Sequence, residues 1–307
     1  MTRRWLALLS VLALVAGIAA SALFGGSAQQ TKETPKSSNA NPTGLVPFVA
    51  FGDMGTGESN QLSVAAGMAA YHDKHPFDTV LMLGDNIYPD GNPALFKDKF
   101  ERPYAELLKR GVRFYAALGN HDVRRGREAE MNYPNFNMNG KAYYSFVKGD
   151  ALIEFFALDS TDYDRKQARW LDGALAASKA QWKVAYFHHP LYSSGITHGS
   201  DVKLRAQLEP LFVKYGVAMV LSGHDHAYER TKPQRGVQYF VSGAGGQLRK
   251  GDLDRRTSFF GVGNDTVNSF MYFEASPDKI SFAAMDPAGN TLDSGVLVKS
   301  RAATSGQ

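Results

Sequence analysis

The chain has 307 residues, 44% apolar and 21% charged, a composition that excludes a disordered tail protein, a collagen-like fibre and a protein with many membrane spans. Its 34 Lys and Arg against 30 Asp and Glu give a net charge of +4, and the basic residues do not cluster with aromatic ones, so no nucleic-acid partner is expected. Cysteine is absent, which excludes disulfides, thiolate ligands and a cysteine nucleophile, so any metal must be bound by His, Asp, Glu, Asn or Tyr.

The N-terminus has the pattern of an export signal. Arg3 and Arg4 precede a nearly unbroken apolar run over residues 5–24, and small residues up to Ala28 offer cleavage sites. The same run is just long enough to cross a bilayer as an uncleaved anchor. Residues 1–28 are therefore predicted to be an export signal or a membrane anchor, and the protein is expected to be periplasmic or extracellular. Contact with a membrane is expected only through an uncleaved N-terminus.

Residues 29–44 are predicted to be a flexible linker and residues 301–307 a tail, which leaves residues 45–300 for one folded domain.

Five short apolar segments end abruptly in polar residues and are predicted to be buried strands, over residues 46–51, 79–83, 114–118, 184–187 and 217–221. Helices are expected over residues 61–71, 94–110, 164–179 and 201–215, the last two beginning at an aspartate cap. Strands that alternate with helices predict an α/β fold with much parallel pairing. A β-hairpin is expected around Gly149, and residues 236–298 are expected to form a second sheet packed on the first.

Potential metal ligands follow the predicted strands. Because ligands bind at the carboxyl ends of strands in open α/β sheets, these residues are expected to meet: Asp53, Asp85, Tyr88, Asn120, His121, His188, His224 and His226. They are too many for one ion and suit two ions about 3.5–4 Å apart, which a carboxylate such as Asp85 can bridge. A glycine precedes several of these residues, where it lets the chain turn sharply off the strand.

Five motifs resemble those of the calcineurin-like metallophosphoesterases: Gly52-Asp53-Met54-Gly55, Gly84-Asp85-Asn86-Ile87-Tyr88, Gly119-Asn120-His121-Asp122, His188-His189-Pro190 and Gly223-His224-Asp225-His226. Tyr88 stands where other members of the superfamily carry Asp and Arg, which makes the chain similar to the purple acid phosphatases. The short length resembles the small tartrate-resistant acid phosphatases, whereas residues 226–230 look more like the large forms. The resemblance covers roughly residues 46–286.

The resemblance implies a four-layer α-β-β-α sandwich with two central mixed β-sheets and two metal ions at one sheet edge. Carried over by motif, one metal would be bound by Asp53, Asp85, Tyr88 and His226, and the other by Asp85, Asn120, His188 and His224. The Tyr88 phenolate suits Fe(III) at the first position, whereas the second suits Fe(II), Zn(II) or Mn(II).

The resemblance also implies a reaction, namely hydrolysis of phosphomonoesters by a metal-bound hydroxide, which is expected to be fastest at acidic pH. The substrate would be a small phosphate ester or a phosphoprotein. His121 and His198 are expected to face the substrate, where either can protonate the leaving alkoxide. Two alternatives remain: a phosphodiesterase or nucleotide hydrolase acting at the same site, and a catalytically weak metal-binding surface protein.

Several neighbouring residues have a structural explanation. Successive strand residues point to opposite faces, so the ring of His189 is expected to lie away from the metals. Asp122 is expected to orient His121 or cap the next segment, and Asp225 to point away from the metals. The glycine-rich residues 242–246 are expected to form a tight turn. The arginines just beyond His121 are candidates for binding an anionic substrate, namely Arg124, Arg125 and Arg127.

Overall fold

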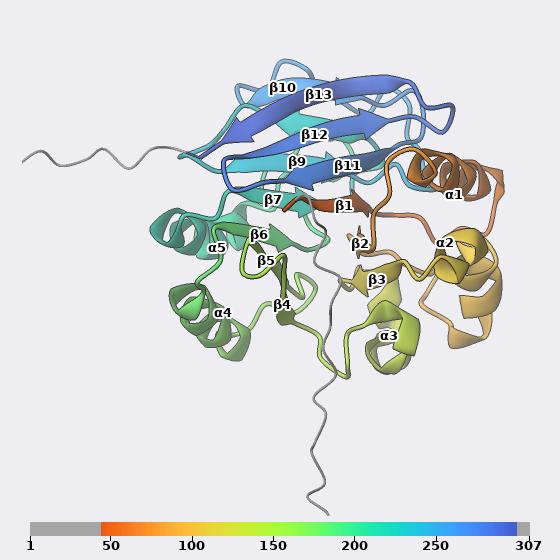
Figure 1. Cartoon of the computed structure of the whole chain (residues 1–307), viewed down its shortest axis with the longest axis horizontal. Helices are drawn as coiled ribbons and strands as arrows, with labels where there is room; N and C mark the ends of the chain where they lie inside the picture. Colours follow the sequence, from red (N-terminus) through yellow and green to blue (C-terminus); the bar gives the residue numbers. More distant parts are fainter. Residues whose placement is uncertain (1–43, 300–307) are drawn as a thin grey trace, which may run out of the picture. The chain divides into compact units, whose positions relative to one another are not determined.

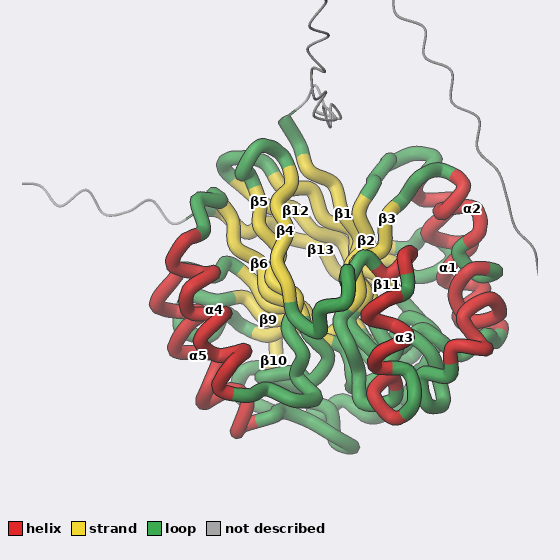
Figure 2. Tube along the Cα trace, turned by 90° about the horizontal axis from the view of Figure 1, so that it is seen from below, coloured by secondary structure: helices red, strands yellow, loops and turns green. Residues whose placement is uncertain are grey.

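Two mixed β-sheets lie at the centre of the computed structural model, which describes residues 44–299 (Figure 1). Helices α1, α2 and α3 lie on one side of the strands, and α4 and α5 lie on the other (Figure 2). This arrangement confirms the predicted four-layer sandwich with two mixed sheets. The predicted export segment, the linker up to residue 43 and the tail lie outside the described residues. Within residues 44–299, no helix is long and apolar enough to cross a membrane.

The first sheet has six strands in the order β13-β12-β11-β1-β2-β3. Its strands are β1 (Val46–Phe51), β2 (Thr79–Met82), β3 (Arg113–Ala116), β11 (Phe270–Ala275), β12 (Lys279–Met285) and β13 (Thr291–Val298). The second sheet has seven strands in the order β10-β8-β9-β7-β6-β5-β4. Its strands are β4 (Tyr144–Lys148), β5 (Ile153–Ala157), β6 (Trp182–Tyr186), β7 (Met219–Ser222), β8 (Tyr228–Thr231), β9 (Gln238–Ser242) and β10 (Phe260–Asn264).

The main core lies between the sheets and consists largely of aromatic rings. Phe48 of β1 stacks on Phe273 of β11 with ring centroids 4.7 Å apart, and it meets Phe155 of the other sheet edge-on at 4.9 Å. Phe240 of β9 contacts Phe282 of β12 in the same way at 5.0 Å. Edge-to-face pairs of this kind stabilise an interface beyond the apolar area that they bury. A second apolar cluster, which includes Phe156 and Phe212, fills the space between the seven-stranded sheet and its two helices.

The helices are α1 (Ser59–His72), α2 (Ala105–Lys109), α3 (Arg127–Asn132), α4 (Arg165–Ala177) and α5 (Val202–Tyr215). The predicted caps are confirmed, because Asp164 accepts a hydrogen bond from Gln167 N at 2.7 Å and Asp201 accepts one from Leu204 N at 2.9 Å. These bonds satisfy backbone donors that the first turn of a helix leaves free. The hairpin of β4 and β5 is confirmed as well.

The prediction of one helix over residues 94–110 is wrong. This stretch is divided into a 3-10 turn at Pro93–Leu95, a wide π-helical turn at Lys97–Glu101 and the short helix α2. Pro103 explains the break, because proline has no backbone N–H and its ring clashes with the carbonyl four residues earlier. The widened turn is visible in the hydrogen bond from Arg102 N to Lys97 O at 2.9 Å.

The C-terminal strands do not form a separate second sheet, which corrects another prediction. Of those in residues 236–298, β9 and β10 belong to the seven-stranded sheet, whereas β11 to β13 extend the six-stranded one. β11 pairs antiparallel with β1, so the last part of the chain completes the sheet with which the fold begins. The five strands predicted to precede ligands are therefore divided between the two sheets.

Candidate functional site

The predicted ligands follow strands that end at the same level. In the six-stranded sheet, parallel pairing places Phe51 of β1 opposite Met82 of β2, and Met82 opposite Ala116 of β3. In the other sheet, parallel β6 and β7 place Tyr186 opposite Leu221. A backbone hydrogen bond from Gly52 N to Ser242 O at 2.7 Å joins the ends of β1 and β9 across the two sheets. The carboxyl ends of both sheets thus meet at one edge, as expected for a ligand site in an α/β fold.

One half of the site consists of Asp53, Tyr88 and His226. The Tyr88 hydroxyl donates to Asp53 Oδ1 at 3.1 Å and lies 3.3 Å from His226 Nε2. His226 Nε2 is 3.5 Å from the same carboxylate oxygen. Asp53 Oδ2 accepts a hydrogen bond from His224 N at 2.8 Å, which fixes the carboxylate. Three donor atoms of different type thus converge, although β1, β2 and the β7–β8 connection are far apart in sequence.

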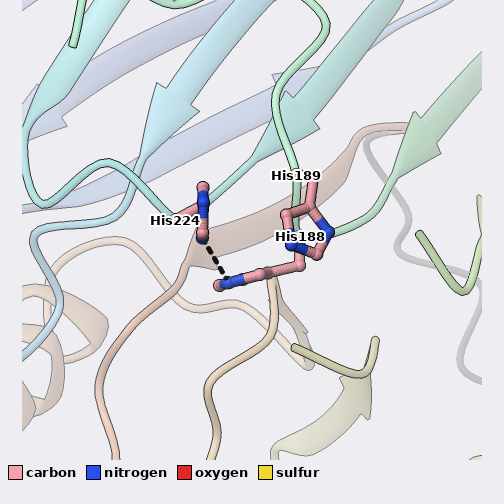
Figure 3. A group of neighbouring side chains, drawn as sticks. All are labelled: His188, His189 and His224. Carbon is pink, nitrogen blue, oxygen red and sulfur yellow. Dashed lines mark hydrogen bonds between the residues drawn. The ribbon is translucent and has the colours of Figure 1, made fainter. Parts of the chain in front are cut away.

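The other half of the site consists of Asn120, His188 and His224, and Figure 3 shows the two histidines facing each other. His188 Nε2 is 3.0 Å from Asn120 Oδ1 and 3.1 Å from His224 Nδ1. His188 Nδ1 donates to Leu83 O at 3.0 Å, so the lone pair of this imidazole is on Nε2. A backbone carbonyl that fixes the tautomer in this way is typical of a metal-binding histidine.

Asp85 lies between the two halves. Its Oδ1 is 3.5 Å from His188 Nε2 and accepts a hydrogen bond from His121 N at 2.9 Å. The negative charge of its carboxylate also helps to raise the pKa of the Tyr88 hydroxyl on the other side. This is the position that a carboxylate shared between two cations requires.

The chemistry of the donors fits two cations. Burial and the neighbouring histidines hold the pKa of His188 well below its usual range and lower the pKa of His224 to about 2, so both rings are neutral. Burial and the adjacent carboxylates Asp53 and Asp85 raise the pKa of the Tyr88 hydroxyl. A cation would reverse this balance, because it favours carboxylate and phenolate oxygens over their protonated forms. Neutral imidazoles, buried carboxylates and a phenol oxygen are suitable ligands for hard and borderline metal ions.

Three predicted ligands have a left-handed backbone conformation, which residues other than glycine seldom adopt. The φ angles of Asp53, Asp85 and His224 are 57°, 52° and 73°. This conformation costs free energy and persists only where the surrounding structure imposes it. Conformations of this kind are common at functional sites. The left-handed turn directs each side chain toward the common centre as soon as its strand has ended.

Glycine is required at two positions because the loops are in close contact. A Cβ on Gly223 would lie 2.5 Å from Asp53 Oδ2, and a Cβ on Gly119 would collide with the backbone and carboxylate of Asp85. The missing side chains allow the ligand-bearing loops to approach one another.

His121 and His198 lie beside this centre. His121 Nδ1 donates to Pro89 O at 2.6 Å, and its Nε2 lies 3.9 Å from Asp85 Oδ2. His198 is exposed, and its ring centroid is 4.2 Å from that of His224. The structure therefore brings together all nine residues that the sequence singled out, and their assignment as ligands or substrate-facing groups stays a prediction.

The ring of His189 does not lie away from the predicted ligands, which corrects a prediction. The ring centroid of His189 is 5.0 Å from that of His188 and 4.6 Å from that of His224, and ligand atoms of the three histidines lie within 4.8 Å of one another (Figure 3). Side chains alternate only within a strand, and β6 ends at Tyr186. His189 Nδ1 is 2.9 Å from Ser160 Oγ, so a supporting role for His189 remains the prediction.

Two aspartates beside the ligands support the surrounding loops. Asp122 is buried and accepts hydrogen bonds from Gly119 N at 2.7 Å and from Ile87 N at 3.1 Å, so it joins two loops of the site instead of orienting His121 or capping the next segment. Sequence analysis missed its buried partner Asn86, although the position beside Asp85 was a usable signal. Asp225 points away from the centre, as expected, and accepts hydrogen bonds from Ser193 Oγ at 2.5 Å and Gly199 N at 3.2 Å.

The arginines beyond His121 have protein partners. Arg125 pairs with Asp90 at 3.0 Å, and Arg127 pairs with the buried Asp159 at 2.5 Å. Arg124 is exposed, and its guanidinium lies 3.4 Å from Pro89 O.

The glycine-rich turn after β9 packs against the loops that carry the predicted ligands. Gly245 N donates to Gly52 O at 3.0 Å, and Gln247 N donates to Asp53 O at 3.0 Å.

Comparisons with known proteins agree with this arrangement. The model of the calcineurin-like phosphoesterase family matches residues 46–228. Purple acid phosphatase 17 of Arabidopsis thaliana is 28% identical over 246 residues, which are 70% of this chain and 72% of that protein. Tartrate-resistant acid phosphatase type 5 of Mus musculus is 26% identical over 294 residues, which are 82% of this chain and 90% of that protein.

Two solved structures share the fold. The purple acid phosphatase PPD1 from yellow lupin (Lupinus luteus) seeds superposes with a TM-score of 0.70 at 22% identity, over 83% of this chain and 54% of the lupin chain. This chain therefore spans about half the length of the lupin enzyme. GAP50, the anchor in the inner membrane complex of Plasmodium, superposes with a TM-score of 0.73 at 19% identity, over 85% of this chain and 90% of that chain.

Proposed function

Because this chain belongs to the calcineurin-like phosphoesterase family, we propose that it is an exported, dinuclear metal-dependent phosphatase that hydrolyses phosphomonoesters, with highest activity at acidic pH. The observation that carries the proposal is the position of Tyr88. Its hydroxyl lies within 3.3 Å of both Asp53 Oδ1 and His226 Nε2, where a phenolate ligand would favour a trivalent ion. The distant similarity to plant and mammalian acid phosphatases supports the same reaction.

The seven donors form two ligand sets that share Asp85. Fe(III) would be bound by Asp53, Asp85, Tyr88 and His226, and Fe(II), Zn(II) or Mn(II) by Asp85, Asn120, His188 and His224. When bound, the two cations would neutralise phosphoryl oxygens and lower the pKa of water at the site, so that a nucleophile is available below neutral pH. Groups that bind phosphoryl oxygens are the main requirement of phosphoryl transfer, because negative charge is spread over those oxygens.

The residues beside the ligands would act on the substrate. His121 is oriented by its bond from Nδ1 to Pro89 O, which leaves Nε2 free to hold a proton at the edge of the site. His198 presents an exposed ring over His224. Either imidazole, when protonated, can donate that proton to the leaving alkoxide. A small phosphate ester or a phosphoprotein is the proposed substrate.

The test compares hydrolysis of p-nitrophenyl phosphate and bis-p-nitrophenyl phosphate from acidic to alkaline pH, using the full chain loaded with iron plus zinc or manganese. Faster cleavage of the monoester with an acidic optimum is expected. Faster cleavage of the diester would favour a phosphodiesterase, and no cleavage of either by the metal-loaded protein would favour a metal-binding surface protein. His75→Ala serves as a control, because His75 is an exposed histidine that stacks on Tyr71 of α1.

Export is tested separately, by finding where the full chain accumulates when it is produced in a bacterium. Recovery outside the cytoplasm with a shortened N-terminus would support a cleaved signal, and recovery in the membrane at full length would support an anchor. Recovery of the full chain in the cytoplasm would contradict export but would leave the proposed reaction intact.

A further inference from the structure

The loop that carries His198 has a fixed backbone although its tip is exposed. We call residues 193–200 the His198 loop. Its two ends are joined, since Ser193 N donates to Ser200 Oγ at 3.0 Å and Ser200 Oγ donates to Ser193 O at 3.2 Å. The loop also runs beside a later segment, because Gly195 forms a β-bridge with Leu253. Such bonds oppose local opening of an exposed loop.

Three buried carboxylates hold the His198 loop at successive points. Asp225 binds its ends, as described above. Glu229 accepts hydrogen bonds from Ser194 N at 2.7 Å and from Ser194 Oγ at 2.6 Å. Asp252 accepts hydrogen bonds from Thr197 N at 3.1 Å and from Thr197 Oγ1 at 2.5 Å. Asp252 is therefore the carboxylate that binds the residue next to His198.

Asp252 also connects this loop to the metal-ligand side of the site. Its backbone oxygen accepts a hydrogen bond from Ile196 N at 2.7 Å, and its Oδ2 lies 3.7 Å from Arg249 Nη1. Arg249 N in turn donates to His226 O at 3.0 Å. Burying a carboxylate is costly unless it is paired and hydrogen-bonded. Here the hydrogen bonds of Asp252 fix the backbone of Ile196 and Thr197, the two residues before His198.

We propose that Asp252 is a positioning residue that acts through His198. By binding both the amide and the hydroxyl of Thr197, Asp252 fixes the backbone from which the His198 imidazole reaches over His224. The inference rests on the proposed function, because it requires His198 to contact the substrate. Without this carboxylate the loop keeps its ends, held by Ser193 and Ser200, but its tip is free to move.

The test is a double-mutant cycle on the full, metal-loaded chain, with kcat and KM measured for p-nitrophenyl phosphate. Asp252→Asn is expected to lower kcat by roughly tenfold, because the Thr197 bonds then lose their charged acceptor. In the His198→Ala background the same change is expected to have no further effect on kcat, because its consequence passes through the missing imidazole. Asp254→Asn is the matched control, since that aspartate lies in the same segment and its side chain pairs with the exposed Arg256 at 2.7 Å.

Two further measurements separate positioning from folding. Thr197→Val is expected to reproduce the loss of kcat, whereas Thr197→Ser keeps the hydroxyl and is expected to keep the rate. Hydrogen exchange at the amides of the His198 loop is expected to accelerate by about tenfold in Asp252→Asn, with metal content and melting temperature close to those of the unchanged protein.

An equal loss of kcat in both backgrounds would overturn the inference, as would unchanged kcat and unchanged exchange in Asp252→Asn. Absence of phosphoester hydrolysis by the unchanged protein would instead overturn the proposed function. In that case the exchange measurement still decides whether Asp252 fixes the loop, and unchanged exchange would refute the positioning as well.

Discussion

Replacing Gly223 by alanine tests whether close contact between loops defines the site. Gly223 lies directly before His224, and its missing side chain faces the Asp53 carboxylate. A Cβ there would lie 2.5 Å from Asp53 Oδ2, 3.0 Å from Leu83 O and 3.4 Å from His188 Nδ1. Carbon and oxygen atoms normally approach no closer than about 3.4 Å, so the Asp53 carboxylate would have to move by about 1 Å.

That movement has a cost that the structure allows us to estimate. Asp53 Oδ2 accepts the hydrogen bond from His224 N at 2.8 Å, and moving the carboxylate breaks it. Overpacking a core typically costs about 1–3 kcal/mol, and losing a hydrogen bond to a charged group costs about 1.5–3 kcal/mol. Together they predict a destabilisation of about 2.5–6 kcal/mol, which in a domain of this size lowers the melting temperature by roughly 5–24 °C. Metal affinity is expected to fall at least about tenfold, because a ligand and its support both move.

The assay measures the melting temperature and the metal content of Gly223→Ala after dialysis against limiting iron and zinc. Gly173→Ala in α4 is the control, because a Cβ there meets nothing within 4 Å, and alanine in a helix should stabilise by roughly 0.5–1 kcal/mol. If Gly223→Ala binds metal with unchanged affinity and melts like the unchanged protein, then close contact at this position does not define the site.

Four further predictions concern the ligands, their neighbours and pH. Asp85→Asn is expected to reduce metal content at both positions and to lower turnover by orders of magnitude, and a near-normal rate with full metal content would refute its shared role. His121→Ala is expected to keep both metals and to lose mainly kcat, whereas loss of metal would make His121 a ligand. Tyr88→Phe is expected to remove the visible absorption that a phenolate on Fe(III) produces, and a spectrum identical to that of the unchanged protein would place Fe(III) elsewhere. Burial raises the pKa of Glu229 from 4.5 to about 7, so its folded state favours the protonated form and the unchanged protein should lose stability as pH rises through this window. Relative to Glu229→Gln, it should therefore lose about 2 kcal/mol between pH 5 and pH 8 in denaturant titrations, and parallel curves for the two proteins would contradict the assignment.

The convergence of the predicted ligands could be foreseen because the segments that carry them follow strands with a clear local signal. A short apolar segment that stops at a glycine and a polar residue identifies both the strand and its end. β1 matches its expected bounds, and β2, β3, β6 and β7 differ from theirs by one or two residues at one or both ends. Parallel strands that end in register then bring the following residues together, whichever sheet each strand joins. The aspartate caps of α4 and α5 were predictable for the same reason, since the signal lies within one turn of chain.

The features that were predicted wrongly depend on long-range contacts or on a single residue that disturbs a good pattern. The apolar spacing over residues 94–110 is helical, but Pro103 interrupts the backbone bonds that a continuous helix needs. The strands near the C-terminus have similar alternating patterns, and no local feature shows that β11 pairs with β1 whereas β9 pairs with β7. The Asp252 contact with Thr197 joins residues 55 positions apart, so sequence spacing could not indicate it.

The junction between the sheets explains why the chain retains strained residues at its strand ends. Each sheet supplies part of the donor set, and the bonds from Gly52 N to Ser242 O and from Gln247 N to Asp53 O join the sheets at that point. The left-handed conformations of Asp53, Asp85 and His224 each cost roughly 1–2 kcal/mol, which a fold under selection for stability alone would avoid. They persist where the surrounding structure imposes them, and at Asp53 the turn that aims the carboxylate inward also accepts the bond from Gln247 N that joins the two sheets. The strain at the three strand ends is therefore the structural counterpart of the proposed metal centre.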